Sequence, residues 1–503
     1  MDGLSLYPRL VVAGLSGSSG KTVVSMGLLR LLRRAGIETR AFKKGPDYID
    51  ASWLAWASSH TARNLDTYLM GPERVFESFT RHALTDGINL VEGNRGVFDG
   101  LDAAGTHSSA GLAQCLSAPL ILVVNASKVT RTAAAFVLGC QKLDPGIAMC
   151  GVILNNVSGE RHQEILRNAI ESACRIPVVG ALPKAKISLL PERHLGLVPP
   201  EEHPALEKLD RDLLNLVDGR LDLDALLSIA RAAPPLQRSM GTGDSGPITT
   251  DVNIGYLKDA AFSFYYPENL EQLERAGGKL IPVSALKATS LPDNLQALYI
   301  GGGFPESYAQ ALTENSSFLR SVKGAALRGL PMYAECGGLM LLAKNLMWKD
   351  ARYAMAGLFP FEVEVRDTPQ GHGYSELRVD KPNPFFPVGL ILRGHEFHYS
   401  CVLASEEATP TACAVNRGTG CFEKREFVTT NNVVATYTHL HALGSPEWAT
   451  GIVNAARVFA LQAGDHGEKH GEKAARAKGP EPEVPGHAPV NSPNQQPPAS
   501  DSP

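Results

Sequence analysis

The stretch that decides the fold is Leu10-Val-Val-Ala-Gly-Leu-Ser-Gly-Ser-Ser-Gly-Lys-Thr22. It predicts a buried strand, a glycine-rich turn and a helix that opens at the Lys-Thr pair. Backbone N–H groups at such a helix start, together with one lysine, form a cradle for polyphosphate. Four residues are therefore expected to bind ATP: Gly17, Gly20, Lys21 and Thr22. The hydroxyl of Thr22 is expected to bind the Mg²⁺ ion that bridges the phosphates. Leu15 stands where the standard pattern has glycine, so this is a variant P-loop.

Carboxylates follow two further predicted strands. The strand from Thr39 runs into a Gly-Pro turn with Asp47 and Asp50, and the strand from Ile88 ends at Glu92. In an open α/β sheet, ligands collect at the carboxyl ends of the strands. Acids placed there beside a P-loop can supply the remaining ligands of a phosphate-bound Mg²⁺. Each acid alone could equally be an ordinary turn residue, but the set together favours a site.

The alternation of strands and helices predicts an α/β protein whose first domain is a doubly wound parallel sheet. Residues 233–250 have the composition of a linker, so we expect a P-loop domain at 1–232 and a second α/β domain at 251–462. The Pro-, Gly- and polar-rich residues 463–503 predict a disordered tail.

Bulk composition narrows the function classes. The 503 residues are 44% hydrophobic and 20% charged, with a formal net charge of −4, which argues against nucleic acid or an anionic membrane as partner. No apolar run is long enough to span a bilayer, and no secretory leader is recognisable. The eight cysteines include no C-x-x-C pair, so a reducing cytoplasmic location is expected. The oligomeric state cannot be inferred.

Cys336 is the predicted nucleophile of the second domain. It lies between a strand that ends at Glu335 and a glycine pair that opens a helix, which is the arrangement of a nucleophile elbow. The helix start is expected to lower the thiol pKa. Backbone N–H groups of Gly301–Gly303 could hold a developing oxyanion. A base must come from elsewhere, and the Thr438-His-Leu-His441 run offers His439 or His441.

Two other basic clusters have open interpretations. His395 and His398 could line a substrate cleft or belong to a polar strand at a domain junction. Arg193 and His194 could hold an anionic substrate or form a surface ion pair.

The chain resembles the cobalamin-pathway glutamine amidotransferases, the family of the cobyrinic acid a,c-diamide synthases and cobyric acid synthases. The resemblance runs from the P-loop to about residue 461. It rests on these motifs: Lys44-Gly-Pro-Asp-Tyr-Ile-Asp50, Glu92-Gly-Asn-Arg-Gly-Val-Phe-Asp-Gly100, Glu192-Arg-His-Leu-Gly-Leu197, Asp259-Ala-Ala-Phe-Ser-Phe-Tyr-Tyr-Pro267, Gly301-Gly-Gly-Phe-Pro-Glu306, Glu335-Cys-Gly-Gly338, Gly394-His-Glu-Phe-His-Tyr399 and Thr438-His-Leu-His441. Asn94 and Arg95 form a more polar pair than the family pattern leads us to expect.

The resemblance implies a ligase that amidates the a and c carboxylates of cobyrinic acid, using ATP, Mg²⁺ and L-glutamine, through acyl-phosphates. It implies a class I glutamine amidotransferase fold for the second domain, with Cys336 as nucleophile and His439 as its partner. Asp47 and Glu92 would then handle metal, and Asp50 and Asp99 substrate. Class I enzymes usually end in His-x-Glu, whereas this chain has His441 in the third position, so the sequence identifies no carboxylate partner for His439.

Three rival interpretations remain. A synthase for another tetrapyrrole, such as nickel-sirohydrochlorin or hydrogenobyrinic acid, would share every motif. A P-loop partitioning protein of the ParA/MinD type would lack the Cys/His domain. A stand-alone ligase similar to dethiobiotin synthetase would end near residue 232.

Overall fold

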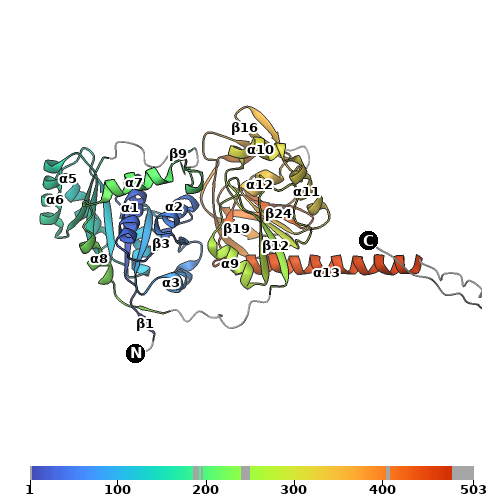
Figure 1. Ribbon diagram of the computed structural model, residues 1–503, viewed down its shortest axis with the longest axis horizontal. Coiled ribbons are helices and arrows are strands. Elements are labelled where there is room, and N and C mark those ends of the chain that lie inside the picture. The colour runs from blue at the N-terminus through green and yellow to red at the C-terminus, as the bar shows by residue number, and fades with distance from the viewer. Residues whose placement is uncertain (1–2, 185–191, 194–195, 239–249, 404–407, 478–503) are drawn as a thin grey trace, which may run out of the picture. The chain divides into compact units, whose positions relative to one another are not determined.

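The structure is a computed structural model that describes residues 3–184, 192–193, 196–238, 250–403 and 408–477, with the backbone alone for 192–193, 196–197, 201 and 463–477. Residues Met1–Phe459 form one compact unit and Ala460–Pro503 a second. Figure 1 traces the elements. None of the helices within the described residues combines the length and the apolar character that crossing a bilayer requires.

A seven-stranded parallel sheet forms the first half of the larger unit, in the order β4-β3-β5-β2-β6-β7-β8. Its strands are β2 (Arg9–Gly14), β3 (Thr39–Lys44), β4 (Arg63–Leu65), β5 (Ile88–Gly96), β6 (Leu120–Asn125), β7 (Met149–Val157) and β8 (Val178–Pro183). Side chains of β2 alternate between two hydrophobic clusters, with Val11 and Ala13 on one face and Leu10 and Val12 on the other. A strand buried on both faces explains the unbroken apolar run that precedes the P-loop.

Helices cover both faces of this sheet. One face carries α1 (Lys21–Arg34), α2 (Tyr48–Ser58), α7 (Leu206–Val217) and α8 (Leu223–Arg231). The other carries α3 (Gly71–His82), α4 (Ser109–Cys115), α5 (Thr132–Leu143) and α6 (Glu160–Cys174). Short pieces complete this half: β1 (Leu4–Ser5) pairs with β11 (Leu236–Gln237), β9 (Glu192–Arg193) pairs with β10 (Gly196–Leu197), and η1 is Pro200–Glu202.

The second half contains a ten-stranded mixed sheet in the order β13-β12-β14-β15-β24-β23-β22-β19-β20-β25. Its parallel part is β12 (Val252–Leu257), β13 (Gly278–Val283), β14 (Ala297–Ile300), β15 (Met332–Glu335) and β24 (Val433–Thr436). The antiparallel part is β19 (Gly371–Val379), β20 (Ile391–His398), β22 (Thr411–Arg417), β23 (Arg425–Thr430) and β25 (His439–Leu440). The predicted fold class, two α/β halves with the P-loop sheet first, is confirmed.

The remaining elements of the second half surround this sheet. They are α9 (Pro267–Arg275), η2 (Pro305–Tyr308), α10 (Ala309–Glu314), α11 (Ser316–Leu327), α12 (Gly337–Leu342) and a four-stranded sheet of β16 (Asn345–Trp348), β17 (Ala351–Ala354), β18 (Glu362–Val365) and β21 (Ser400–Val402). Buried residues around the first sheet run from Tyr7 to Leu236, and those around the second from Val252 to Ala456. Most of the predicted linker, residues 239–249, lies outside the described residues.

The last helix differs from the sequence prediction. α13 spans Pro446–Ala477, so residues 463–477 are helical where a disordered tail was predicted. Their sequence keeps Ala, Glu and Lys, which are good helix formers, and the first proline after Pro446 is Pro480. The disorder prediction was driven by the Pro-rich composition further along, at 478–503, which lies outside the described residues.

Candidate functional site

The P-loop joins β2 to α1. Gly20 caps α1 with φ 90°, a left-handed conformation that glycine adopts without strain, and the Asn155 side chain lies directly against its Cα. Lys21 lies across the loop, with its Nζ 2.8 Å from the Arg95 carbonyl oxygen. Gly17 is exposed at the tip of the turn, and its part in nucleotide binding stays a prediction. The loop offers N–H groups and one cation at a helix start, as a phosphate site requires.

A buried lysine organises the acids beside the loop. Lys43, at the end of β3, is 1% exposed, and its Nζ lies 2.7 Å from both Glu92 Oε1 and Asp50 Oδ2. The Thr22 hydroxyl donates to the same Glu92 oxygen at 3.1 Å. Burial alone would lower the pKa of Lys43, but the two carboxylates outweigh it and raise this pKa well above its usual value. Lys43 was not among the predicted site residues, although a lysine at the end of a buried strand beside acids was a usable signal.

Asp47 and Asp99 take other positions. Asp47 caps α2, with its Oδ1 accepting from the Asp50 backbone N–H at 2.8 Å. Asp99 accepts from the Gly96 N–H at 2.7 Å, in the turn that follows β5. Of the four predicted carboxylates, only Asp50 and Glu92 share an ion-pair partner among the described residues, and Glu92 also contacts Thr22 of the P-loop.

The acid cluster fits a divalent cation in part. Glu92 is fully buried, and its second oxygen, Oε2, has no hydrogen-bond partner among the described residues. Burial raises the pKa of Glu92, since a charge there is poorly solvated. Within the described residues no group of three or more His, Cys, Asp or Glu is arranged to hold a metal alone. Glu92 and the Thr22 hydroxyl would thus share an ion with phosphate oxygens, which is how Mg²⁺ is commonly bound.

Asp47 gives a pH dependence of stability. Burial and the neighbouring Asp50 charge raise the pKa of Asp47 to about 7, against 3.8 for an ordinary aspartate. The folded protein therefore holds a proton that the unfolded chain releases, and stability falls as pH rises from about 4 to about 7. Asn can also cap the helix, so we expect the stability of Asp47→Asn to increase relative to that of wild type as the pH is raised from ~5 to ~8. Thermal unfolding without metal or nucleotide measures this.

The matched comparison is Asp50→Asn. Burial opposes ionisation of Asp50, but Lys43 outweighs it and lowers the pKa of this carboxyl. The charged form is then present in both the folded and unfolded states above pH ~5, so Asp50→Asn should lose its ion pair at both pH values. Because the Asp50 charge helps to raise the pKa of Asp47, this variant should also lose less stability than wild type between pH ~5 and ~8. A pH-independent difference for Asp47→Asn would contradict the raised pKa.

Cys336 has the backbone geometry of a nucleophile elbow. It joins β15 to α12 with φ 47° and ψ −95°, a strained conformation for a residue other than glycine. Its N–H donates to the Thr436 carbonyl at 2.7 Å, which ties the turn to the end of β24. A Cβ on Gly337 would lie 3.2 Å from the backbone N of Gly303, so the turn packs closely against the Gly301–Gly303 loop.

The expected low thiol pKa is wrong for this structure. The Cys336 side chain is buried, and this desolvation, with the charge of Glu306, raises its pKa far above the usual value. The Gly337 N–H acts in the opposite direction but is outweighed by burial and the nearby acids. The thiol therefore depends on a base that removes its proton as it reacts.

His439 lies beside this turn, and its carboxylate partner was missed by the sequence analysis. Glu335, the residue before Cys336, is fully buried, and its Oε2 lies 3.3 Å from His439 Nδ1. The Tyr299 hydroxyl donates to the same oxygen at 3.0 Å. A Cβ on Gly302 would lie 2.6 Å from His439 Cε1, so the imidazole also borders the glycine loop. Glu335 thus supplies the carboxylate partner of His439 that a His-x-Glu pattern would supply from the third position.

Glu335→Gln tests this positioning role. We expect the kcat for glutamine hydrolysis to fall about 10²-fold, because the amide cannot stabilise a protonated imidazole. The acid limb of its pH profile should shift as well. Amidation supplied with ammonium salts should keep its rate, since it does not use His439. Equal loss with glutamine and with ammonia would show that Glu335 is needed only for folding.

His441 does not reach His439's carboxylate. Its Nε2 lies 3.7 Å from Glu268 Oε2, and its ring packs on Tyr266 with centroids 4.6 Å apart. Glu268 also pairs with Arg63 of β4 at 3.2 Å. His441 therefore belongs to a polar contact that joins the two sheets.

One tyrosine from the first half touches the candidate base. Tyr48, the first residue of α2, stacks on Phe264 with centroids 5.1 Å apart and lies 5.4 Å from the His439 ring. His395 stacks on His439 with centroids 5.0 Å apart and also contacts Tyr48 at 5.8 Å. Of the two interpretations of His395, the structure supports the one in which it lines a cleft, whereas His398 stacks on Tyr437 at 3.8 Å. The side chains of Arg193 and His194 lie outside the described residues.

One cavity of about 730 Å³ is lined by residues from both halves. Its lining includes Asp47, Asp50 and Asp99 from the first half, and His395 and His439 from the second. A molecule in this cavity can contact the phosphate-site acids and the candidate base together.

The comparisons with known proteins agree with this architecture. Residues 10–198 match the CobQ/CobB/MinD/ParA nucleotide binding domain, and residues 253–447 match the CobB/CobQ-like glutamine amidotransferase domain. A nucleotide-binding sheet joined to an amidotransferase sheet defines a class of glutamine-dependent, amide-forming ligases.

Named relatives narrow the class. The cobyrinate a,c-diamide synthase of Magnetococcus marinus is 40% identical over 447 residues, covering 88% of this chain and 96% of that protein. Those of Archaeoglobus fulgidus and Dehalococcoides mccartyi are 36% and 38% identical, covering 89% and 90% of this chain and 97% and 99% of theirs. The chain belongs to the cobyrinate a,c-diamide synthase family. The resemblance drawn from the motifs is confirmed, and the ParA/MinD and stand-alone ligase alternatives are excluded.

Proposed function

We propose that the protein amidates the a and c carboxylates of cobyrinic acid, using ATP and L-glutamine. The observation that carries the proposal is the single cavity that reaches both Asp50 and His439. Ammonia is mostly protonated in water at neutral pH, so its source and its acceptor must face each other in a site that excludes solvent.

In the second half, the Cys336 sulfur attacks the side-chain carbonyl carbon of glutamine while His439 accepts the thiol proton. Collapse of the tetrahedral intermediate breaks the C–N bond, and His439 returns the proton to the leaving NH₃. The γ-glutamyl thioester that remains is hydrolysed to glutamate and free thiol. Glu335 keeps the imidazole oriented and stabilises its positive charge.

In the first half, a substrate carboxylate oxygen attacks the γ-phosphorus of ATP, giving an acyl-phosphate and ADP. Ammonia then attacks the acyl carbon, and inorganic phosphate leaves. Lys21 and the loop N–H groups would hold the phosphates, and Thr22 and Glu92 would hold Mg²⁺, which neutralises charge on the transferred group. Tyr48 follows Asp47 in the chain and contacts both Phe264 and His439, so it places an aromatic ring beside the candidate base.

We propose a cytoplasmic location, since all eight cysteines are free, including buried Cys336.

The test uses cobyrinic acid labelled with ¹⁸O in its carboxylates and glutamine labelled with ¹⁵N in its amide. Two ¹⁵N amides should appear per product molecule, with one ADP per amide. One ¹⁸O should move into phosphate for each amide formed, as an acyl-phosphate requires. Amide formation without transfer of ¹⁸O into phosphate would show that the reaction does not pass through an acyl-phosphate. Turnover of nickel-sirohydrochlorin or hydrogenobyrinic acid, but not of cobyrinic acid, would show that the substrate is another tetrapyrrole.

A further inference from the structure

We propose that Arg95 and His372 form a subsite for a carboxylate side arm of the tetrapyrrole that is not itself amidated, with Arg417 serving a second arm. This inference rests on the proposed function and adds the residues that orient the substrate.

Arg95 and His372 come from different sheets and meet at the cavity wall. Arg95 lies near the end of β5, and His372 lies near the start of β19. Arg95 Nη2 is 3.0 Å from His372 Nε2. A guanidinium can only donate, so His372 accepts through that nitrogen and is neutral in this contact. Both side chains are exposed to the cavity that they line.

Arg95 and Arg417 are available to bind substrate carboxylates, because the acids of the cavity have other partners. Each carboxylate of the lining already has partners: Lys43 for Asp50, backbone N–H groups for Asp47 and Asp99, and His398 with the Thr419 and Gly420 N–H groups for Glu396. Among the described residues, no carboxylate forms an ion pair with Arg95 or Arg417, although both line the cavity. Arg95 instead contacts a neutral ring nitrogen, which a carboxylate can displace at a gain, since charge-assisted bidentate bonds are stronger.

The position of Arg95 also suits a residue that orients the substrate relative to the phosphate site. Its carbonyl oxygen holds Lys21 of the P-loop at 2.8 Å, so the side-chain subsite is fixed to the phosphate site by one residue's backbone. Arg95 has a φ of 49°, a left-handed conformation that is uncommon for a residue other than glycine. An arm held by Arg95 and His372 would place a neighbouring arm toward Asp50 and the transferred phosphoryl group. Holding the non-reacting arms is how a site selects among several chemically similar carboxylates.

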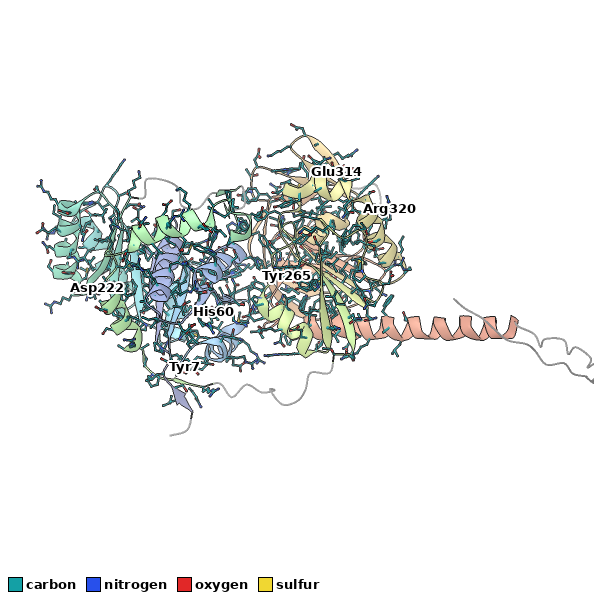
Figure 2. The ribbon with its side chains drawn as sticks, in the orientation of Figure 1. Tyr7, His60, Asp222, Tyr265, Glu314 and Arg320 are labelled. Carbon is teal, nitrogen blue, oxygen red and sulfur yellow. The ribbon has the colours of Figure 1, made fainter. Side chains whose placement is uncertain are left out.

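The test compares Arg95→Gln and Arg417→Gln with the control Arg320→Gln. Arg320 is exposed on α11, outside the cavity lining (Figure 2). Its replacement by glutamine removes the same charge as the two test substitutions. Binding is measured for cobyrinic acid, for a corrinoid whose carboxylates are all amidated, and for uroporphyrin, a polycarboxylate that is not a substrate. We expect Arg95→Gln to weaken binding of both polycarboxylates about tenfold, with KM rising more than kcat falls, and to leave the amidated corrinoid unaffected. Arg320→Gln should change nothing.

Equal weakening for the amidated corrinoid would show that Arg95 only supports the structure, and unchanged binding of both polycarboxylates would overturn the subsite. Arg95→Lys should recover part of the affinity, because it restores the charge without the bidentate geometry. If wild type fails to amidate cobyrinic acid, the proposed substrate is wrong, but the uroporphyrin comparison still decides the subsite.

Discussion

Cys336→Ala is expected to reduce glutamine-dependent amidation by more than about 10³-fold and to leave ammonia-dependent amidation near the wild-type rate. The thiol is the only group at the elbow that can form the thioester, and its loss leaves the first half's chemistry in place. Burial raises the pKa of this thiol, so its reactivity is expected to depend on His439 rather than on a standing thiolate. The measurement is the rate of amide formation with glutamine and with ammonium chloride on the same preparation.

Cys413→Ala is the matched control. Cys413 is a free, buried cysteine on β22, and it contributes only packing. The Cys413→Ala variant should keep both glutamine-dependent and ammonia-dependent amidation, because removing this small buried side chain leaves the active-site turns unchanged. Glutamine-dependent amidation that survives in Cys336→Ala would remove Cys336 as nucleophile. Loss of both activities would instead point to collapse of the β15–α12 turn.

Features that depend on one segment could be predicted from the sequence. The P-loop, the elbow at Cys336 and the acids at strand ends are each encoded by local spacing, because strand ends of a parallel sheet meet at one edge. Glu335 was missed because the usual carboxylate lies two residues after the histidine. Here it comes from the end of β15, a strand about 100 residues earlier in the chain, in a contact that only the tertiary structure reveals.

Other features could not be predicted from the sequence, because they depend on burial and on contacts between distant segments. Tyr48 was quoted only as part of a motif, yet it crosses from α2 to contact His439 and Phe264. The thiol pKa was expected to be low because a helix start favours an anion, whereas burial of Cys336 controls its value. Burial and contacts between segments far apart in the chain cannot be read from spacing alone.

Lys43→Met should give the largest loss of stability in the first half. The substitution removes the only cation that Glu92 and Asp50 share among the described residues and leaves the fully buried Glu92 carboxylate with the Thr22 hydroxyl but no ion-pair partner. Breaking such a pair by removing one member costs about 3–5 kcal/mol. Hydrogen-exchange mass spectrometry on peptides that cover β3 and β5 measures this loss where it occurs.

The pH dependence distinguishes lost charge pairing from lost packing. Burial already raises the pKa of Glu92, and without Lys43 it should rise further. The folded variant then holds a proton that the unfolded chain releases, so its deficit should be full at pH ~8 and should shrink as pH falls toward ~5.5. Lys142→Met, an exposed position on α5, should change stability by less than about 0.5 kcal/mol at either pH. A deficit for Lys43→Met that does not change with pH would mean that the side chain contributes through packing, and that Glu92 already carries a proton beside the P-loop.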